Sequence, residues 1–178
     1  MATDQIVTVR LGTPADAEAV LPILYAADLA RGRHGFPRDP DRARHRLTGP
    51  DAFFVVAENR DEGGTVGDAT VGRGAVGLAV GMHSREDGGA GRAIPGLCHI
   101  TMVAVQPGWW GQGIGKRLIW ALLSELRTRG YDRAQLFTQA DNTRAQRLYM
   151  GLGFSPTGVL AVSYEGEGIV QYLFDVHR

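Results

Sequence analysis

The chain has 178 residues, of which 44% are hydrophobic, and its 19 basic and 19 acidic side chains give a formal net charge of zero. A balanced charge argues against a broad electrostatic attachment to nucleic acid or to a membrane surface. The apolar content is that of an ordinary globular protein, and no apolar run reaches the roughly 18 residues of a membrane span.

The N-terminal part of the chain predicts one strand and two helices. The β-branched segment 5–11 favours a strand. A helix is expected from about 14 to 30, with Thr13 as its N-cap in a capping box. Pro22 lies inside this segment and is expected to kink or divide the helix. Residues 40–48 predict a short second helix.

The middle of the chain predicts three strands. The apolar run 52–59 indicates a buried strand, and the glycine-rich segment 60–72 a turn region. Residues 73–83 favour a second strand, followed by a polar, flexible loop at 84–96. The strongest strand signal is at 97–105, which is nearly apolar throughout, so this strand is expected at the centre of a sheet.

The C-terminal part predicts two more helices and three more strands. A helix follows residue 111, with leucines and isoleucines at helical spacing, and ends at Gly130. Residues 133–139 favour a strand and 142–152 a helix. The remaining residues predict two strands joined by a turn near Gly166.

The order of these elements indicates an α+β or α/β fold with a mixed sheet of about seven strands flanked by helices. The strand–helix–strand segment 97–139 predicts a right-handed crossover between parallel strands. We find no internal repeat and no linker that divides the chain, so a single domain is expected across residues 1–178.

The N-terminal residues and the cysteine content indicate the cellular compartment in which the protein is expected. The first ten residues, MATDQIVTVR, lack a basic segment followed by an apolar one, so no signal peptide is expected. The single cysteine, Cys98, cannot form an internal disulfide. These features predict a reduced, cytoplasmic protein.

An arginine-rich segment at residues 31–46 has two interpretations. It contains six arginines and two histidines beside two aspartates. Mixed charges of this kind are typical of a solvated surface. The alternative is a mobile flap over a negatively charged ligand.

The stretch WWGQGIGK, residues 109–116, places three glycines where a strand leads into a helix. The amides at a helix N-terminus have no intrahelical partner and carry partial positive charge. Glycine lacks the Cβ atom that would keep a bulky anion from the backbone. Lys116, the only lysine, adds a positive charge. The stretch therefore predicts a cradle for phosphate or pyrophosphate, although a tight turn alone would also use glycine.

Two common phosphate-binding motifs do not match this stretch. The mononucleotide motif G-x-x-x-x-G-K-[ST] fails because Trp110 and Arg117 occupy the positions of its first glycine and its hydroxyl residue. The dinucleotide motif G-x-G-x-x-G, started at Gly111, ends on Lys116 instead of glycine. A nucleotide-binding protein is thus a weak interpretation.

Two segments resemble signatures of the GNAT superfamily of acetyl-CoA-dependent N-acetyltransferases. The segment MVAVQPGWWGQGIGKRLI is similar to the acyl-CoA signature, a strand, V-x-P, [QR]-x-x-G-x-[GA] and a helix, with Trp110 in place of Gln or Arg. The segment DNTRAQRLYMGLGF is similar to N-x-x-A-x-x-x-Y-x-x-x-G-F. Its matching positions are Asn142, Ala145, Tyr149, Gly153 and Phe154.

The resemblance implies a twisted, mixed sheet whose fourth and fifth strands splay apart, with the pantetheine of acetyl-CoA in the gap. No metal is implied. The cofactor-binding residues that the resemblance implies are Met102, Val103, Val105, Trp110, Gly111, Gln112, Gly113, Ile114, Gly115, Lys116, Asn142 and Ala145.

Two residues are candidates for proton transfer. Tyr149 matches the family tyrosine that protonates the departing thiolate, although its helical stripe also suits a buried core tyrosine. His99 lies in the part of the strand where the family often has an acidic group that deprotonates the amine through water. A histidine could serve as this base, although a lone histidine in a strand is more often structural. Glu58 and Tyr164 are weaker alternatives, and solvent could suffice. Cys98 should face away from His99 as a buried apolar residue.

The resemblance implies acetyl transfer from acetyl-CoA to a primary amine, directly and in a ternary complex. A non-catalytic module that binds or senses acyl-CoA is the alternative. A small molecule or a peptide could supply the amine, and the chain itself gives no sign of which. No nucleic-acid or membrane partner is expected, and a homodimer is left open.

Overall fold

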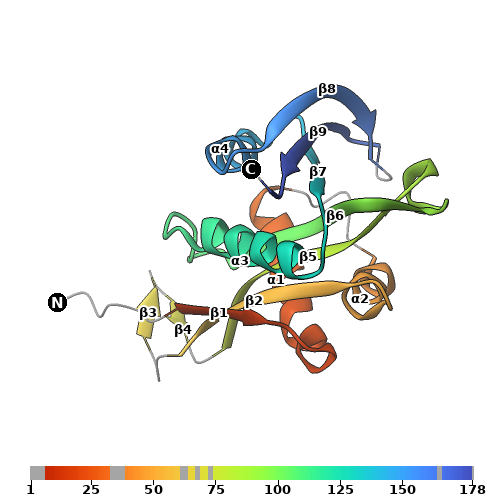
Figure 1. Ribbon diagram of the computed structural model, residues 1–178. Helices are drawn as coiled ribbons and strands as arrows, with labels where there is room; N and C mark the ends of the chain where they lie inside the picture. The colour runs from red at the N-terminus through yellow and green to blue at the C-terminus, as the bar shows by residue number, and fades with distance from the viewer. Residues whose placement is uncertain are drawn as a thin grey trace. The chain divides into compact units, whose positions relative to one another are not determined.

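The computed structural model describes residues 7–32, 39–60, 64–66, 69–71, 74–163 and 166–177 (Figure 1). The chain forms two compact units. Unit 1 comprises residues 1–80 and 102–122, and unit 2 comprises residues 81–101 and 123–178. No helix in the described ranges is long and apolar enough to cross a membrane.

The described residues form a mixed seven-stranded sheet in the order β1-β2-β5-β6-β7-β9-β8, together with a separate hairpin, β3-β4. The strands are β1 (Val7–Leu11), β2 (Phe53–Asn59), β3 (Gly64–Val66), β4 (Ala69–Val71), β5 (Gly74–Arg85), β6 (Ala93–Val105), β7 (Arg133–Gln139), β8 (Ser155–Val162) and β9 (Gly168–Asp175). The helices are α1 (Ala17–Ala30), α2 (Pro40–Thr48), α3 (Ile114–Thr128) and α4 (Thr143–Gly151), with short 3-10 turns η1 (Pro14–Asp16) and η2 (Asp87–Gly89). This architecture confirms the predicted fold class.

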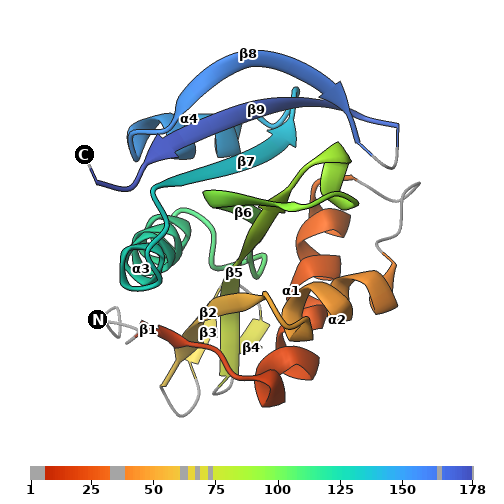
Figure 2. The same ribbon diagram turned by 45° about the vertical axis from the view of Figure 1, so that its right-hand side comes forward.

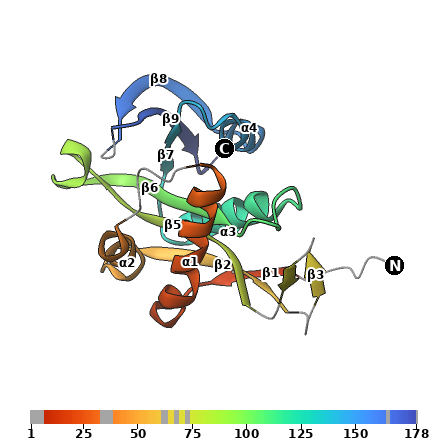
Figure 3. The ribbon, with the colours of Figure 1, turned by 180° about the vertical axis from the view of Figure 1, so that it is seen from behind.

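In unit 1, α1 and α2 pack on one face of the strands (Figure 3). The predicted capping box is present, because the Thr13 amide donates to Asp16 Oδ2 over 2.7 Å before α1 begins. Asp39 caps α2 by accepting from the amides of Asp41 and Arg42. The apolar faces of both helices meet even-numbered residues of β2, β5 and β6. The cluster includes Val20, Leu24, Leu47, Phe54, Val56, Leu78, Val80, Met102 and Ala104.

Helix α3 lies close to β5 within unit 1. Its side chains Leu118, Ile119 and Leu122 are fully buried, as the helical spacing predicts. A Cβ atom built on Gly77 would lie 2.9 Å from Leu118 Cδ1 and 3.1 Å from the Ala104 carbonyl oxygen. Glycine at position 77 therefore allows the start of α3 to pack tightly against the sheet.

In unit 2, β7 pairs in parallel with β6 from Leu97–Arg133 to Ile100–Leu136, which confirms the predicted parallel pairing of these two strands. The pairing ends at Ile100 and Leu136, although β7 continues to Gln139. A splay between the two strands requires such an end of the pairing. Strand β9 lies between β7 and β8 and is antiparallel to both (Figure 2).

Three local predictions were wrong in part. Pro22 lies inside α1 without dividing it, so the division, one of the two predicted effects, is absent. The turn region 60–72 contains the β3-β4 hairpin. The expected loop 84–96 is strand at both ends, because β5 continues to Arg85, β6 begins at Ala93 and the Glu86 amide donates to the Arg92 carbonyl; only residues 86–92 connect the two strands. The polar composition of these residues hid a long hairpin that backbone pairing stabilises.

Candidate functional site

The loop between β6 and α3 in unit 1 exposes its backbone at two glycines. Gly111 has a φ of 85° and Gly113 a φ of 75°, both in the left-handed region that other residues rarely adopt. A Cβ built on either glycine would have no atom within 4 Å. Both are exposed, so the room in front of this backbone is open to a ligand.

The opening turn of α3 has the polarity of an anion site. The Arg117 amide donates to the Gly113 carbonyl over 3.1 Å, which makes Gly113 the N-cap. Within the described residues, none of the hydrogen bonds has the amide of Gly111, Gln112 or Gly113 as its donor. The first turn has no acidic residue, and the Lys116 side chain is exposed. These groups fit a diphosphate bound by main-chain N–H groups.

Several predicted cofactor residues can offer only their backbone. The side chains of Ile114 and Met102 are buried, at 2% and 4% exposed. Trp110 donates its indole N–H to the Val105 carbonyl over 2.7 Å and packs against the apolar cluster of unit 1. The Trp110 side chain therefore anchors the loop to the end of β6. Val103 and Val105 are half-buried and Gly115 lies in the first turn of α3.

His99 lies on β6 in unit 2, on the half-buried face of the strand. Its neighbours Cys98 and Ile100 point to the opposite face and are 0% and 3% exposed. Burial raises the pKa of the Cys98 thiol to about 12, so this thiol is no nucleophile at neutral pH. The predicted orientation of Cys98 is confirmed. The His99 ring lies 6.0 Å from the Phe137 ring of β7.

A row of uncharged polar side chains crosses the same face of unit 2. Gln135, directly opposite His99 in the strand register, donates from Nε2 to Ser84 Oγ over 2.6 Å. Gln171 donates from Nε2 to Gln135 Oε1 over 2.8 Å, and Thr157 donates from Oγ1 to Gln171 Oε1 over 2.9 Å. We did not predict this row, although the period-two alternation around His99 carried the signal.

Helix α4 in unit 2 holds the remaining candidates. Tyr149 is 7% exposed, and its ring lies 5.9 Å from that of Phe154 and 6.2 Å from that of Tyr172. The Asn142 Oδ1 atom accepts from the Ala145 amide over 3.2 Å, so Asn142 caps the helix. Both residues are half-buried.

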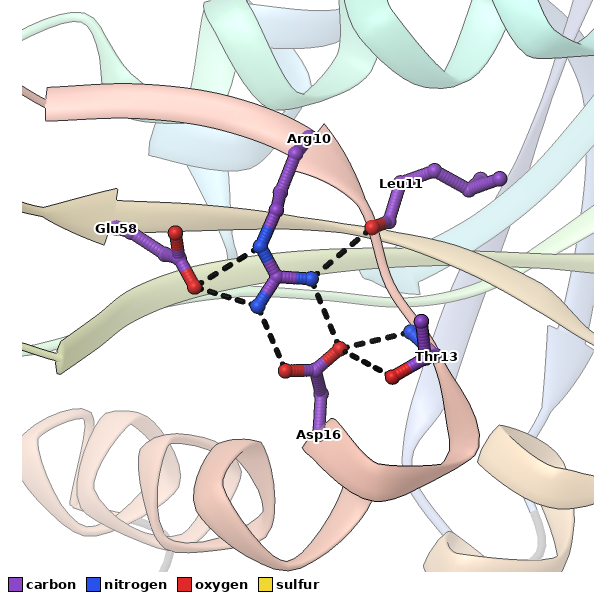
Figure 4. A network of polar contacts seen from close by, with 5 residues as sticks. All are labelled: Arg10, Leu11, Thr13, Asp16 and Glu58. Atoms are coloured by element: carbon purple, nitrogen blue, oxygen red, sulfur yellow. Dashed lines mark hydrogen bonds and ion pairs between the residues drawn. The ribbon is translucent and has the colours of Figure 1, made fainter.

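Of the two weaker base candidates, Glu58 is held in an ion-pair cluster. Glu58 Oε1 accepts from Arg10 Nε over 3.0 Å, and the same guanidinium donates to Asp16 and to the Leu11 carbonyl (Figure 4). Hydrogen bonds from Arg10 hold the pKa of Asp16 well below its usual range. Glu58 therefore belongs to a structural ion-pair cluster at the start of unit 1. Tyr164 lies outside the described residues.

The arginine-rich segment 31–46 is engaged where the structure describes it. Arg31 pairs with Asp28 over 2.5 Å, and Arg44 pairs with Glu18 over 2.7 Å. These ion pairs favour the interpretation as surface, and residues 33–38 lie outside the described ranges. Among the described residues, no cluster of three or more His, Cys, Asp or Glu side chains could hold a metal ion.

The sequence pattern of the acetyltransferase (GNAT) family matches residues 23–154. The chain belongs to the GNAT family. The match includes β6, the loop of Gly111 and Gly113, and α4. Of the candidate residues of this GNAT protein, His99, Asn142, Ala145 and Tyr149 lie in unit 2. The others lie in unit 1 and are Met102, Val103, Val105 and residues 110–116.

Solved GNAT structures share the fold. The ribosomal-protein-S18-alanine N-acetyltransferase from Escherichia coli has a TM-score of 0.71 at 19% identity, and the match covers 96% of this chain and 94% of that one. The protein yncA from Salmonella typhimurium, solved with its cofactor acetyl-CoA, has a TM-score of 0.67 at 21% identity, with the same coverage of 96% and 94%.

Sequence relatives match over a shorter stretch. The mycothiol acetyltransferase of Beutenbergia cavernae is 42% identical over 62 residues, which cover 35% of this GNAT chain. The matched stretch spans only 21% of that relative's own length.

Proposed function

We propose that this GNAT protein is an N-acetyltransferase that moves the acetyl group of acetyl-CoA directly to a primary amine in a ternary complex. The observation that carries the proposal is the exposed opening turn of α3, where Gly111 and Gly113 adopt left-handed conformations with open space in front. Family membership supplies the acyl donor that such a turn would bind. We further propose that residues 1–178 act as one acetyltransferase domain.

The diphosphate of acetyl-CoA would bind to the main-chain N–H groups of residues 111–116, with Lys116 adding its charge. The residues proposed to line the rest of the cofactor site, on the strength of the two sequence signatures, are Met102, Val103, Val105, Trp110, Asn142 and Ala145. For Trp110, Ile114 and Met102 the contact is proposed for the backbone, because their side chains are used within the fold.

The proposed reaction moves one proton from nitrogen to sulfur. The amine nitrogen attacks the thioester carbon, a C–N bond forms, and the C–S bond breaks. His99 accepts the proton that nitrogen loses, and the Tyr149 hydroxyl donates a proton to the departing sulfur. The products are an acetamide and free coenzyme A. Tyr149 is buried beside two aromatic rings, and a phenol can donate its proton from the neutral form.

The acceptor is proposed only as a class, a primary amine on a small molecule or a peptide. The names of two relatives, a mycothiol acetyltransferase and a ribosomal-protein-S18-alanine N-acetyltransferase, cover both kinds. Neither relative decides between the two, because the first match is short and the second shows the fold alone.

A thiol-release assay tests the proposal. Acetyl-CoA is incubated with the protein and a panel of amines that includes amino acids, amino sugars, polyamines and peptides with free N-termini. The rate without amine is subtracted. Amine-dependent release of coenzyme A is expected for at least one class. Binding of acetyl-CoA without turnover across the panel would instead favour the acyl-CoA-sensing module.

We also propose that the protein forms a homodimer through β8. This strand is last in the sheet order, and Val159, Leu160 and Val162 are 48%, 78% and 71% exposed. Edge strands of monomers are usually protected by charged side chains. The segment SPTGVLAV has no charged residue, so two copies could pair antiparallel without placing like charges opposite each other.

A further inference from the structure

A buried hydroxyl near His99 has no partner in the protein. The Oγ1 atom of Thr101 is inaccessible to solvent, and no hydrogen-bond partner lies near it within the described residues. Polar atoms removed from water are nearly always hydrogen-bonded, because an unsatisfied one destabilises the fold. The Thr101 hydroxyl therefore needs a hydrogen-bond partner that the described part of the chain does not supply.

The position of Thr101 on β6 indicates what that partner is. Thr101 is the residue after Ile100, where the pairing of β6 with β7 ends. It shares the half-buried face of the strand with His99, while Ile100 between them points to the opposite, buried face. The strand rises ~3.3 Å per residue, so the backbones of the two residues are about 6.6 Å apart. The two side chains lie side by side on one face of the strand, where a small group placed between them could contact both.

The polar side chain that stands opposite His99 on β7 is already hydrogen-bonded. Gln135 stands opposite His99 and is held at both ends of its amide, by Ser84 and by Gln171. The ring of Phe137, next on the same face, is apolar. Both side chains are uncharged, so the surroundings of Thr101 on β7 suit a small neutral donor such as an amine.

We propose that the Thr101 hydroxyl binds the acceptor amine beside His99, and that this pair selects primary over secondary amines. This inference rests on the proposed acetyl transfer. A neutral primary amine has two N–H groups and one lone pair. One N–H faces His99, which takes its proton as the C–N bond forms. The second N–H donates to Thr101 Oγ1 and remains in the amide product, and the lone pair attacks the thioester carbon. A secondary amine lacks that second N–H.

Substitution at Thr101 tests the inference, with Thr8 as the matched control. Thr8 Oγ1 on β1 is also buried without a partner in the described residues. Valine replaces threonine with nearly the same shape, so T101V and T8V should both keep or raise the melting temperature. T101V should lower kcat/KM for a primary amine by about tenfold or more. The ratio of kcat/KM for the primary amine to that for the matching secondary amine should therefore be smaller than in the wild type. T8V should keep the wild-type kinetics, and T101S should restore most of the activity.

The coenzyme A affinity of T101V, measured by calorimetry, should stay within about twofold of the wild type. Thr101→Ala removes the same hydroxyl and provides a second measurement if T101V does not fold. Wild-type kcat/KM and amine preference in a folded T101V or T101A would overturn the inference while leaving the proposed function intact. A loss of coenzyme A affinity with an unchanged KM for the amine would overturn it too. Absence of amine-dependent thiol release by the wild type would instead overturn the proposed function.

Discussion

The indole nitrogen of Trp110 donates a 2.7 Å hydrogen bond to the carbonyl of Val105, which joins the glycine loop to the last residue of β6. The replacement Trp110→Phe keeps a ring in the apolar cluster but leaves that carbonyl without this donor. We expect a loss of about 1 kcal/mol in the free energy of unfolding. Urea denaturation measures it, with Trp120→Phe as control, since Trp120 is 44% exposed. An equal loss in the free energy of unfolding for the two substitutions would show that the Trp110 hydrogen bond does not stabilise the fold.

Tyr149→Phe separates the proton donor from a core tyrosine. If the hydroxyl protonates the departing sulfur, kcat should fall by about 100-fold while the affinity for acetyl-CoA is unchanged. The neighbouring Tyr172 is the matched control, because it is also buried and its hydroxyl donates to Gln146 Oε1 over 3.2 Å. Tyr172→Phe should lower stability and leave kcat nearly intact. Unchanged turnover in Tyr149→Phe would remove this residue from the mechanism.

The ion-pair cluster around Arg10 predicts a pH dependence of stability. Hydrogen bonds from Arg10 lower the pKa of Asp16 in the folded protein. The unfolded state, with an aspartate pKa of about 3.9, then binds more protons, so this stabilisation is present above that pH and is lost as the pH falls further. Asp16→Asn should cost roughly 1–2 kcal/mol at pH 7 and less at pH 3.

Urea unfolding at the two pH values checks the prediction for Asp16. Glu18→Gln is the control, because this carboxylate also pairs with an arginine, Arg44, but its side chain is 71% exposed. Its effect should be smaller at either pH. A destabilisation by Asp16→Asn that does not depend on pH would show that the carboxylate acts through packing and not through its charge.

The exposed edge of β8 predicts a homodimer that a single charge disrupts. Light scattering should give twice the chain mass of 19.2 kDa for the wild type at micromolar concentration. Leu160→Lys places a charge in the middle of the proposed contact and should yield the monomer. Met150→Lys, at another exposed apolar position in unit 2, should leave the dimer intact. A monomeric wild type at all concentrations would contradict the proposal.

The patterns that predicted the fold are those that depend on local sequence. The apolar run of β6 and the leucine spacing of α3 gave both elements, because each buries a continuous face or stripe. The parallel pairing of β6 with β7 followed from the strand–helix–strand order of residues 97–139. The β3-β4 hairpin and the polar ends of β5 and β6 were missed, because backbone pairing there outweighs weak strand propensity.

The site was predictable in its backbone and less so in its side chains. Glycine at positions 111 and 113 indicates a left-handed φ and open space in front of the backbone, and the structure has both. The hydrogen bond of Trp110 to Val105 depends on how the loop folds back, which no local pattern encodes. The isolation of the Thr101 hydroxyl depends on where the pairing with β7 ends, a property of two strands together.

In the proposed function, main-chain amides at the start of α3 bind the diphosphate of coenzyme A. Gly113→Asp tests it most directly, because aspartate tolerates the left-handed conformation and is a good N-cap, yet its carboxylate would repel a phosphate. Gly130→Asp is the matched control, with a φ of 78° against 75° and the same open space. By calorimetry, we expect coenzyme A affinity to fall at least about tenfold in Gly113→Asp and to change little in Gly130→Asp. A folded Gly113→Asp protein with wild-type affinity would contradict the account.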